Sequence, residues 1–180
     1  MSFGFHSSHG SIKQAIDEIS SSDRERKILM FAAASNRGKG FRPTFPAIHP
    51  SVTCIYATDG HGNKYKRNPQ IISHSPGFAT LGVAVKSACI KGGEVRKSGT
   101  SFATPVAAAI AALVLEFAIK NDMPSEVYHK GLKTKEGIEK VFGTMVTKSD
   151  DFNFIYPWEL WHVKRRDTSV LDEMCKALMP

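Results

Sequence analysis

The 180-residue sequence lacks the usual features of a membrane protein, a secreted disulfide-rich protein or a metalloprotein. Its cysteines, Cys54, Cys89 and Cys175, are odd in number and lack metal-ligand spacing, which predicts free thiols and no metal. The longest nearly apolar run, 105–118, is interrupted by Glu116 and is too short to span a bilayer. No basic segment followed by an apolar one, as in a signal peptide, is visible at the N-terminus. We therefore expect no membrane partner, no cofactor and a cytoplasmic location.

Negative charge is scarce in the middle of the chain. Residues 41–100 have eight Lys or Arg and two Asp or Glu, while the whole chain has a net charge of +7. Aromatic side chains do not alternate with these basic residues as they do on a base-stacking surface, so solvated loops explain the charge better than nucleic-acid binding. The weaker alternative, a nucleic-acid-binding domain, would require a steep salt dependence of binding that depends on Lys64, Lys66 and Arg67.

The composition is that of an ordinary globular domain, with 42% hydrophobic and 23% charged residues. Apolar residues in 11–20 recur at helical spacing, which predicts an amphipathic helix. The short continuous apolar runs 28–33 and 52–57 are typical of strands buried on both faces of a parallel sheet. Strands alternating with helices favour an α/β layered architecture.

The strongest helix prediction covers 101–118, where alanine occupies nearly every face. A helix that is apolar all round should be central, and its alanines allow close approach to a sheet. Two one-sided helices are predicted around 138–145 and 171–178, with an aromatic cluster at 152–161 between them. We expect residues 1–119 to form the main domain and 120–180 a helical and aromatic extension packed on it.

Ser101 occupies the N-terminus of the predicted central helix. Unpaired backbone N–H groups and the positive end of the helix dipole would stabilise an oxyanion there, so a serine at this point is a candidate nucleophile. Gly99 would permit the tight turn into the helix, and Pro105 would be tolerated near the helix start, where N–H groups have no partners. An N-cap role for Ser101 is the simpler alternative, and it is favoured by position alone.

Four segments, taken together, resemble motifs of the subtilisin-like serine proteases (subtilases), in the order of that family. Gly99-Thr100-Ser101-Phe102-Ala103-Thr104-Pro105 resembles the nucleophile motif, and 31–38 resembles the strand and loop of the oxyanion-hole asparagine, here Asn36. Ser2-Phe3-Gly4 resembles the edge segment that pairs with substrate. Phe45-Pro46-Ala47 resembles the turn lining the pocket for the residue before the scissile bond. In detail the sequence most resembles intracellular members from filamentous fungi.

The resemblance implies peptide-bond hydrolysis through an acyl-enzyme on Ser101, with the Asn36 amide and the Ser101 backbone N–H as oxyanion donors. It also implies a three-layer subtilisin-like fold, with a parallel sheet and a buried central helix that begins at the nucleophile. The expected site comprises Ser101 and Asn36 as catalytic residues, Ser2, Phe3, Gly4 and Pro46 as the substrate cleft, and Gly99, Thr100 and Pro105 as support for the nucleophile turn.

A serine nucleophile needs a histidine base and an orienting carboxylate, and in subtilases both precede the serine. They should also precede the edge segment, which here begins at Ser2. We therefore expect the N-terminal strands and both motifs to be missing, the chain alone to be inactive, and the missing part of the domain to be its partner. His9-Gly10-Ser11 echoes the histidine motif but follows the edge segment, and the other histidines have no recognisable carboxylate partner. The alternative is a pseudoprotease or interaction module that retains the fold.

Overall fold

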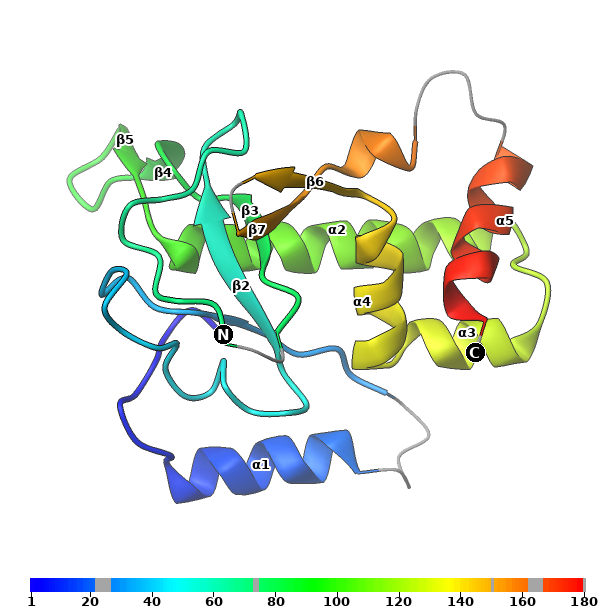
Figure 1. Cartoon of the computed structure of the whole chain (residues 1–180), viewed down its shortest axis with the longest axis horizontal. Coiled ribbons are helices and arrows are strands. Elements are labelled where there is room, and N and C mark those ends of the chain that lie inside the picture. The colour runs from blue at the N-terminus through cyan, green and yellow to red at the C-terminus, as the bar shows by residue number, and fades with distance from the viewer. Residues whose placement is uncertain (22–26, 73–74, 150, 162–166, 180) are drawn as a thin grey trace.

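The computed structural model describes the whole chain except residues 22–26, 73–74, 150, 162–166 and 180. A five-stranded sheet forms its centre, with the strand order β1-β2-β3-β7-β6 (Figure 1). These strands are β1 (Phe31–Ala33), β2 (Thr53–Thr58), β3 (Phe78–Leu81), β7 (Phe152–Ile155) and β6 (Val146–Ser149). The first four are parallel, and β6 runs antiparallel to β7. This confirms the α/β architecture with a mostly parallel sheet.

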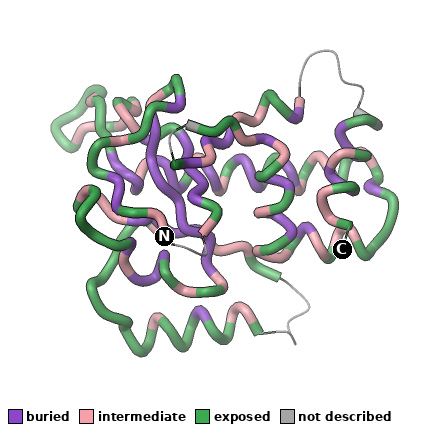
Figure 2. Tube along the Cα trace, viewed as in Figure 1, coloured by how far each residue is buried: buried purple, intermediate pink, exposed green. Residues whose placement is uncertain are grey.

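Strand β2 is buried along its whole length, as its continuous apolar sequence predicts. Its side chains alternate between two clusters. Ile55 and Ala57 pack in the larger cluster with residues of α2 (Thr100–Lys120), whereas Cys54 and Tyr56 pack in a second cluster with Ile16 of α1 (Gly10–Ser20). Because successive strand residues point to opposite faces, α1 and α2 cover opposite sides of the sheet and produce three layers. In Figure 2 the central strands are purple, and most of α1 is green.

Helix α2 packs against β1, β2 and β3 and is longer than the predicted segment. It has 21 residues, and by length and composition alone it is long and apolar enough to cross a membrane. The expectation of no membrane partner stays a prediction. In this structure Ala103 and Ala107 on its inner side have no exposed surface. Small side chains at these positions let the helix axis approach the strands closely, and this contact fixes where the helix begins.

The C-terminal part contributes both helices and strands. Its helices are α3 (Glu126–Leu132), α4 (Lys135–Gly143), the short 3₁₀ helix η1 (Pro157–Glu159) and α5 (Asp167–Leu178), so the helices predicted around 138–145 and 171–178 are confirmed. The sequence did not predict β6 and β7. Phe152 packs in the smaller cluster and Ile155 in the larger one, so the aromatic segment forms an inner strand with both faces buried. The boundary at 119/120 stays a prediction.

A separate two-stranded hairpin, β4 (Val85–Ala88) and β5 (Glu94–Lys97), lies between β3 and α2 in the sequence. Its residues are mostly exposed, and several of the basic residues of the middle region belong to it. The hairpin therefore accounts for part of the local positive charge as solvated surface.

Candidate active site

The turn into α2 requires two glycines. Gly99 has a φ of 156°, and its N–H donates to the carbonyl of Gly82 at 2.8 Å. A Cβ on Gly82 would lie 2.7 Å from the Cβ of Ala57 and 2.9 Å from the Gly99 oxygen. The turn can therefore lie directly on the sheet only because both residues lack a side chain. The first two residues of the helix after this turn are Thr100 and Ser101.

Pro105 lies deeper in the helix than the sequence analysis expected. The helix begins at Thr100, so Pro105 is in its second turn, where a backbone N–H would normally donate to the carbonyl of Ser101. The Ser2 hydroxyl donates to that carbonyl instead, at 3.0 Å. In return the Ser101 hydroxyl donates to the Ser2 carbonyl at 3.1 Å. The predicted edge segment and the predicted nucleophile are thus joined by two hydrogen bonds.

Asn36 follows β1 and lies at the start of α2. Its Oδ1 accepts a hydrogen bond from the Thr100 backbone N–H at 2.9 Å, which identifies Nδ2 as the donor end of the amide. A Cβ on Gly99 would lie 3.0 Å from Nδ2, so the glycine also provides room for this amide. Ser35, just before Asn36, has a φ of 149°, a conformation that favours glycine. The chain therefore holds the Asn36 amide beside the turn at Gly99 that leads into α2.

A cavity of about 200 Å³ lies at this junction. Its lining includes six of the predicted site residues, from the edge segment, the Asn36 loop and the helix start. The complete lining is Ser2, Phe3, Gly4, His6, Ala33, Ser35, Asn36, Arg37, Thr44, Thr100 and Ser101. A Cβ on Gly4 would lie 2.1 Å from Thr44 Oγ1, so only glycine permits the edge segment to pass so close to this wall.

The structure does not bring every predicted residue to this cavity. Pro46 is buried and does not line it, and Gly99 and Pro105 are outside its lining as well. Thr44, two residues earlier in the same segment, does line the cavity. The substrate-binding role of Pro46 stays a prediction.

Five lining residues were not among the predicted site residues: His6, Ala33, Ser35, Arg37 and Thr44. All but Ala33 lie within two residues of a predicted site residue, and this proximity in the sequence was the available signal. The Arg37 guanidinium donates to His6 Nδ1 at 3.1 Å and lies 4.0 Å from the centre of the Phe41 ring. This side of the cavity is therefore cationic.

In the part of the chain that the structure describes, no imidazole or carboxylate lies within hydrogen-bond distance of Ser101 Oγ. Its acceptor, the Ser2 carbonyl, is too weak a base to remove the hydroxyl proton. His9 is exposed ahead of α1. His49 does have a carboxylate partner, since its Nε2 lies 3.0 Å from Asp17 Oδ1, but it does not line this cavity. His74 and His162 lie outside the described residues.

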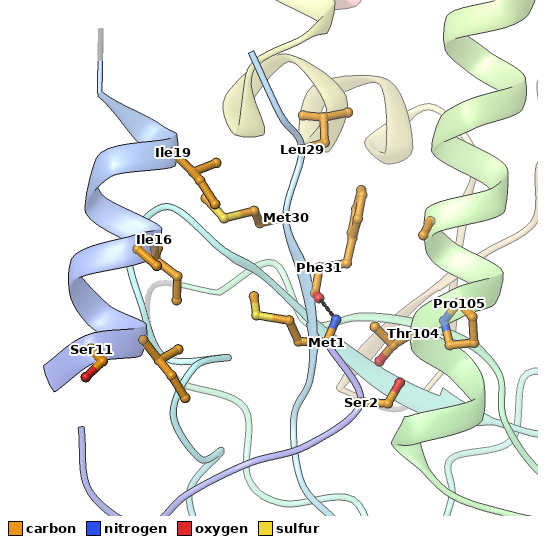
Figure 3. Close-up of a pocket in the computed structure, with 13 residues that line it drawn as sticks. Met1, Ser2, Ser11, Ile16, Ile19, Leu29, Met30, Phe31, Thr104 and Pro105 are labelled. Carbon is orange, nitrogen blue, oxygen red and sulfur yellow. Dashed lines mark hydrogen bonds between the residues drawn. The ribbon is translucent and has the colours of Figure 1, made fainter. Parts of the chain in front are cut away.

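A larger, apolar groove of about 650 Å³ lies next to the candidate site, between α1 and α2 (Figure 3). Ile16 and Ile19 line it from one helix, and Thr104 and Pro105 from the other, with Phe31 of β1 between them. Met1 bonds to β1 in the parallel pattern: its amino group donates to the Phe31 carbonyl, and its carbonyl accepts from Ala33 N–H at 3.0 Å. Burial lowers the pKa of this amino group. The groove thus extends along the outer edge of β1.

The model of the subtilase family matches residues 1–153 of the chain. A curated relative, the alkaline elastase YaB of Bacillus sp. (strain YaB), is 29% identical over 156 residues. That match covers 83% of this chain and 38% of the relative. The chain therefore spans about two fifths of the length of this relative.

Solved protease structures have a similar fold. The prenylagaramide maturation protease PagA matches with a TM-score of 0.65 and 20% identity, over 99% of this chain and 59% of its own. A mutant of the protease domain of PatA matches with a TM-score of 0.68 and 21% identity, over 96% and 58%. At this identity the likeness shows the fold alone. The chain spans somewhat less than three fifths of either structure.

Proposed function

Because the chain belongs to the subtilase family, we propose that it is the nucleophile-bearing part of a serine endopeptidase domain. Ser101 is the nucleophile and Asn36 the oxyanion donor. The observation that carries the proposal is the 2.9 Å hydrogen bond from Thr100 N–H to Asn36 Oδ1, which places the amide at the helix start where Ser101 lies. This hydrogen bond joins residues 64 apart in the sequence and holds the amide in place without substrate, and preorganised catalysis depends on donors held in this way.

In the proposed reaction, Ser101 Oγ attacks the carbonyl carbon of a peptide bond and gives its proton to a base. The negative charge that develops on the carbonyl oxygen is stabilised by Asn36 Nδ2 and by the Ser101 backbone N–H. The peptide C–N bond then breaks, the amine leaves with the proton, and water hydrolyses the resulting ester. The two hydrogen bonds between Ser2 and Ser101 hold the edge segment where an extended substrate would pair.

We further propose that the base and its orienting carboxylate come from polypeptide other than residues 1–180, since none faces Ser101 in the described part. The apolar groove between α1 and α2 suits this partner, because it adjoins Ser2 and Thr104 and follows the edge of β1. Met1 already bonds to β1 in the parallel pattern, so a further strand could continue that pairing. On this proposal the 180 residues alone have little peptidase activity.

The test is complementation. The 180-residue chain is mixed with the portion of the alkaline elastase that its match does not cover, and release of a fluorophore from a peptide substrate is measured. Turnover should require both polypeptides. Ser101→Ala should abolish it, and Asn36→Ala should lower kcat by about 10²–10³, as loss of the corresponding amide does in subtilisin.

Arg42→Gln is the matched control, because Arg42 is exposed and does not line the cavity. Turnover that persists in the Ser101→Ala mixture would contradict the role of Ser101. A mixture that binds peptide, forms a stable complex and has no turnover in any variant would instead support the pseudoprotease alternative.

A further inference from the structure

The lining of the cavity beside Ser101 has charge of a single sign. Of its eleven residues, Arg37 is the one with a permanent charge, and none is Asp or Glu. Its remaining side chains are small, aromatic or neutral polar groups. A cavity of this composition has no electrostatic partner for a cationic side chain, and it attracts an anionic one.

The Arg37 guanidinium is positioned but not neutralised. Its Nη1 donates to His6 Nδ1 at 3.1 Å, and its face lies 4.0 Å from the centre of the Phe41 ring. Neither partner is an anion, and among the described residues no carboxylate forms an ion pair with Arg37. One N–H of the five is accounted for by His6, so the group keeps donors for a carboxylate.

A second cation strengthens the field behind the Asn36 loop. Arg67 Nε donates to the backbone carbonyl of Asn36 at 3.0 Å, and the N–H of Gly38 donates to the carbonyl of Arg67. Arg67 does not line the cavity, so it adds positive potential without occupying space there. Its backbone contact also ties the Asn36 loop to the neighbouring segment, which holds Arg37 in place.

We propose that this cavity selects an acidic side chain, aspartate or glutamate, of a peptide bound across Ser101. The inference rests on the proposed function for the identity of the bound chain as a peptide. Arg37 is the specificity-determining residue, and His6 and Phe41 are its positioning residues. Because the cavity adjoins both Ser101 and Asn36, the selected residue is adjacent to the bond that Ser101 attacks.

Binding, rather than turnover, tests the proposal on the 180-residue chain itself. Three N-acetylated tetrapeptide amides that differ only in a last residue of Glu, Gln or Lys are titrated while backbone NMR shifts are followed. The Glu peptide should bind about tenfold more tightly than the Gln peptide, with the shifts centred on the cavity, since the extra interaction is a charge-assisted hydrogen bond. The preference should decrease as salt is added.

Arg37→Gln should equalise the Glu and Gln peptides, and Arg37→Glu should reverse the order in favour of the Lys peptide. A reversal cannot result from loss of folding. Arg42→Gln is the matched control, and its preference should equal that of the unmodified chain. Equal binding of the Glu and Gln peptides to the unmodified chain, or no binding of either at millimolar concentration, would overturn the proposal.

Failure of the proposed function gives a different result. Ser101→Ala should keep the Glu preference, because the hydroxyl is not part of the cationic side. If the chain prefers the Glu peptide but gains no turnover on complementation, the proposed selectivity for an acidic side chain holds and the proposed peptidase function fails. If the chain gains turnover but cleaves the Glu, Gln and Lys peptides equally, the proposed peptidase function holds and the proposed selectivity fails.

Discussion

Helix α2 has two faces, both apolar in sequence over 103–113, that differ in their surroundings. The sheet face comprises Ala103, Ala107, Ala111, Val114 and Ala118, which are at most 2% exposed. The outer face comprises Pro105, Ala109, Ala112, Leu113 and Ile119, and Leu113 and Ile119 are 62% and 55% exposed. Both sets recur at helical spacing. Over 103–113 the apolar composition therefore does not identify the buried face, and the strands cover only the sheet face.

The sheet face determines where Ser101 lies. Its alanines rest on β1, β2 and β3, so the helix start is fixed relative to the Asn36 loop that follows β1. The outer face has no such role, and the groove lined by Thr104, Pro105 and Ala108 adjoins it. Exposed apolar surface of this kind is typical of a site where further polypeptide packs. Substitutions on the sheet face should therefore lower the free energy of unfolding, whereas substitutions on the outer face should leave it nearly unchanged.

The largest expected difference is between Ala107→Leu and Ala109→Leu. Ala107 has no exposed surface, so three added carbons must displace the strands, and we expect the free energy of unfolding to fall by about 2–4 kcal/mol. Ala109 is exposed, and its substitution should change that value by less than about 0.5 kcal/mol. Helix propensity is nearly the same in both cases, so each serves as the control for the other. Urea unfolding followed by circular dichroism measures the difference, and equal losses would contradict the assignment of faces.

Gly82→Ala extends the comparison to the turn that leads into α2. Its Cβ would overlap the side chain of Ala57 and crowd that of Ala103 on the sheet face, at 2.7 and 3.0 Å. We expect a loss of about 1–3 kcal/mol in the free energy of unfolding. Gly40→Ala is the matched control, since no atom lies within 4 Å of its Cβ position and the change should have almost no effect. A neutral Gly82→Ala would mean that the turn does not contact the sheet so closely.

The sequence predicted this inner architecture well because its chemistry is local. Continuous apolar segments such as those of β1 and β2 are stable only when both of their faces are buried. The same local reasoning applies to the alanines of α2. Ser101 and Asn36 were found because each belongs to a short motif, and the structure places both at one cavity. Their catalytic roles stay predictions.

The sequence did not predict contacts that depend on distant segments. Both faces of β7 are buried, because Phe152 packs in one cluster and Ile155 in the other. The spacing of the aromatic residues alone does not predict this burial. The Ser2 hydroxyl donates to the Ser101 carbonyl, which lacks its usual donor because residue 105 is proline. Ser2 and Ser101 are far apart in the chain. Arg37 was overlooked because its importance arises from the cavity and not from a motif. In each case the deciding partner is distant in sequence.

Ser35→Gly should have a smaller effect, of opposite sign. Ser35 has a φ of 149°, which a residue with a Cβ adopts at a cost, so glycine should raise the free energy of unfolding by about 0.5–1 kcal/mol. The gain is reduced because the Ser35 hydroxyl accepts a 3.3 Å hydrogen bond from Arg37 N–H. Ser35→Ala separates the two effects, since it removes the hydroxyl and keeps the Cβ. Ser35→Ala should therefore be no more stable than the original chain, as thermal unfolding would show.

The reactivity of the cysteines reports solvent access to the sheet and to the exposed hairpin without any substitution. Burial, above all, raises the pKa of the Cys54 thiol to about 12, and Cys54 lies within β2. Cys89 is partly exposed beside the hairpin β4–β5. A neutral alkylating reagent at pH 8 should therefore modify Cys89 first, because only the thiolate reacts and its fraction falls as the pKa rises.

Peptide mapping by mass spectrometry would follow each site, and in urea Cys54 should react about as fast as Cys89. In the folded chain Cys54 should react far more slowly than Cys89, because burial raises the pKa of its thiol and shields it from the reagent. Modification of Cys54 as fast as Cys89 under native conditions would mean that β2 opens readily to solvent. The contrast between the two faces of α2 would then lose its physical basis, because the sheet that covers one face would itself be accessible.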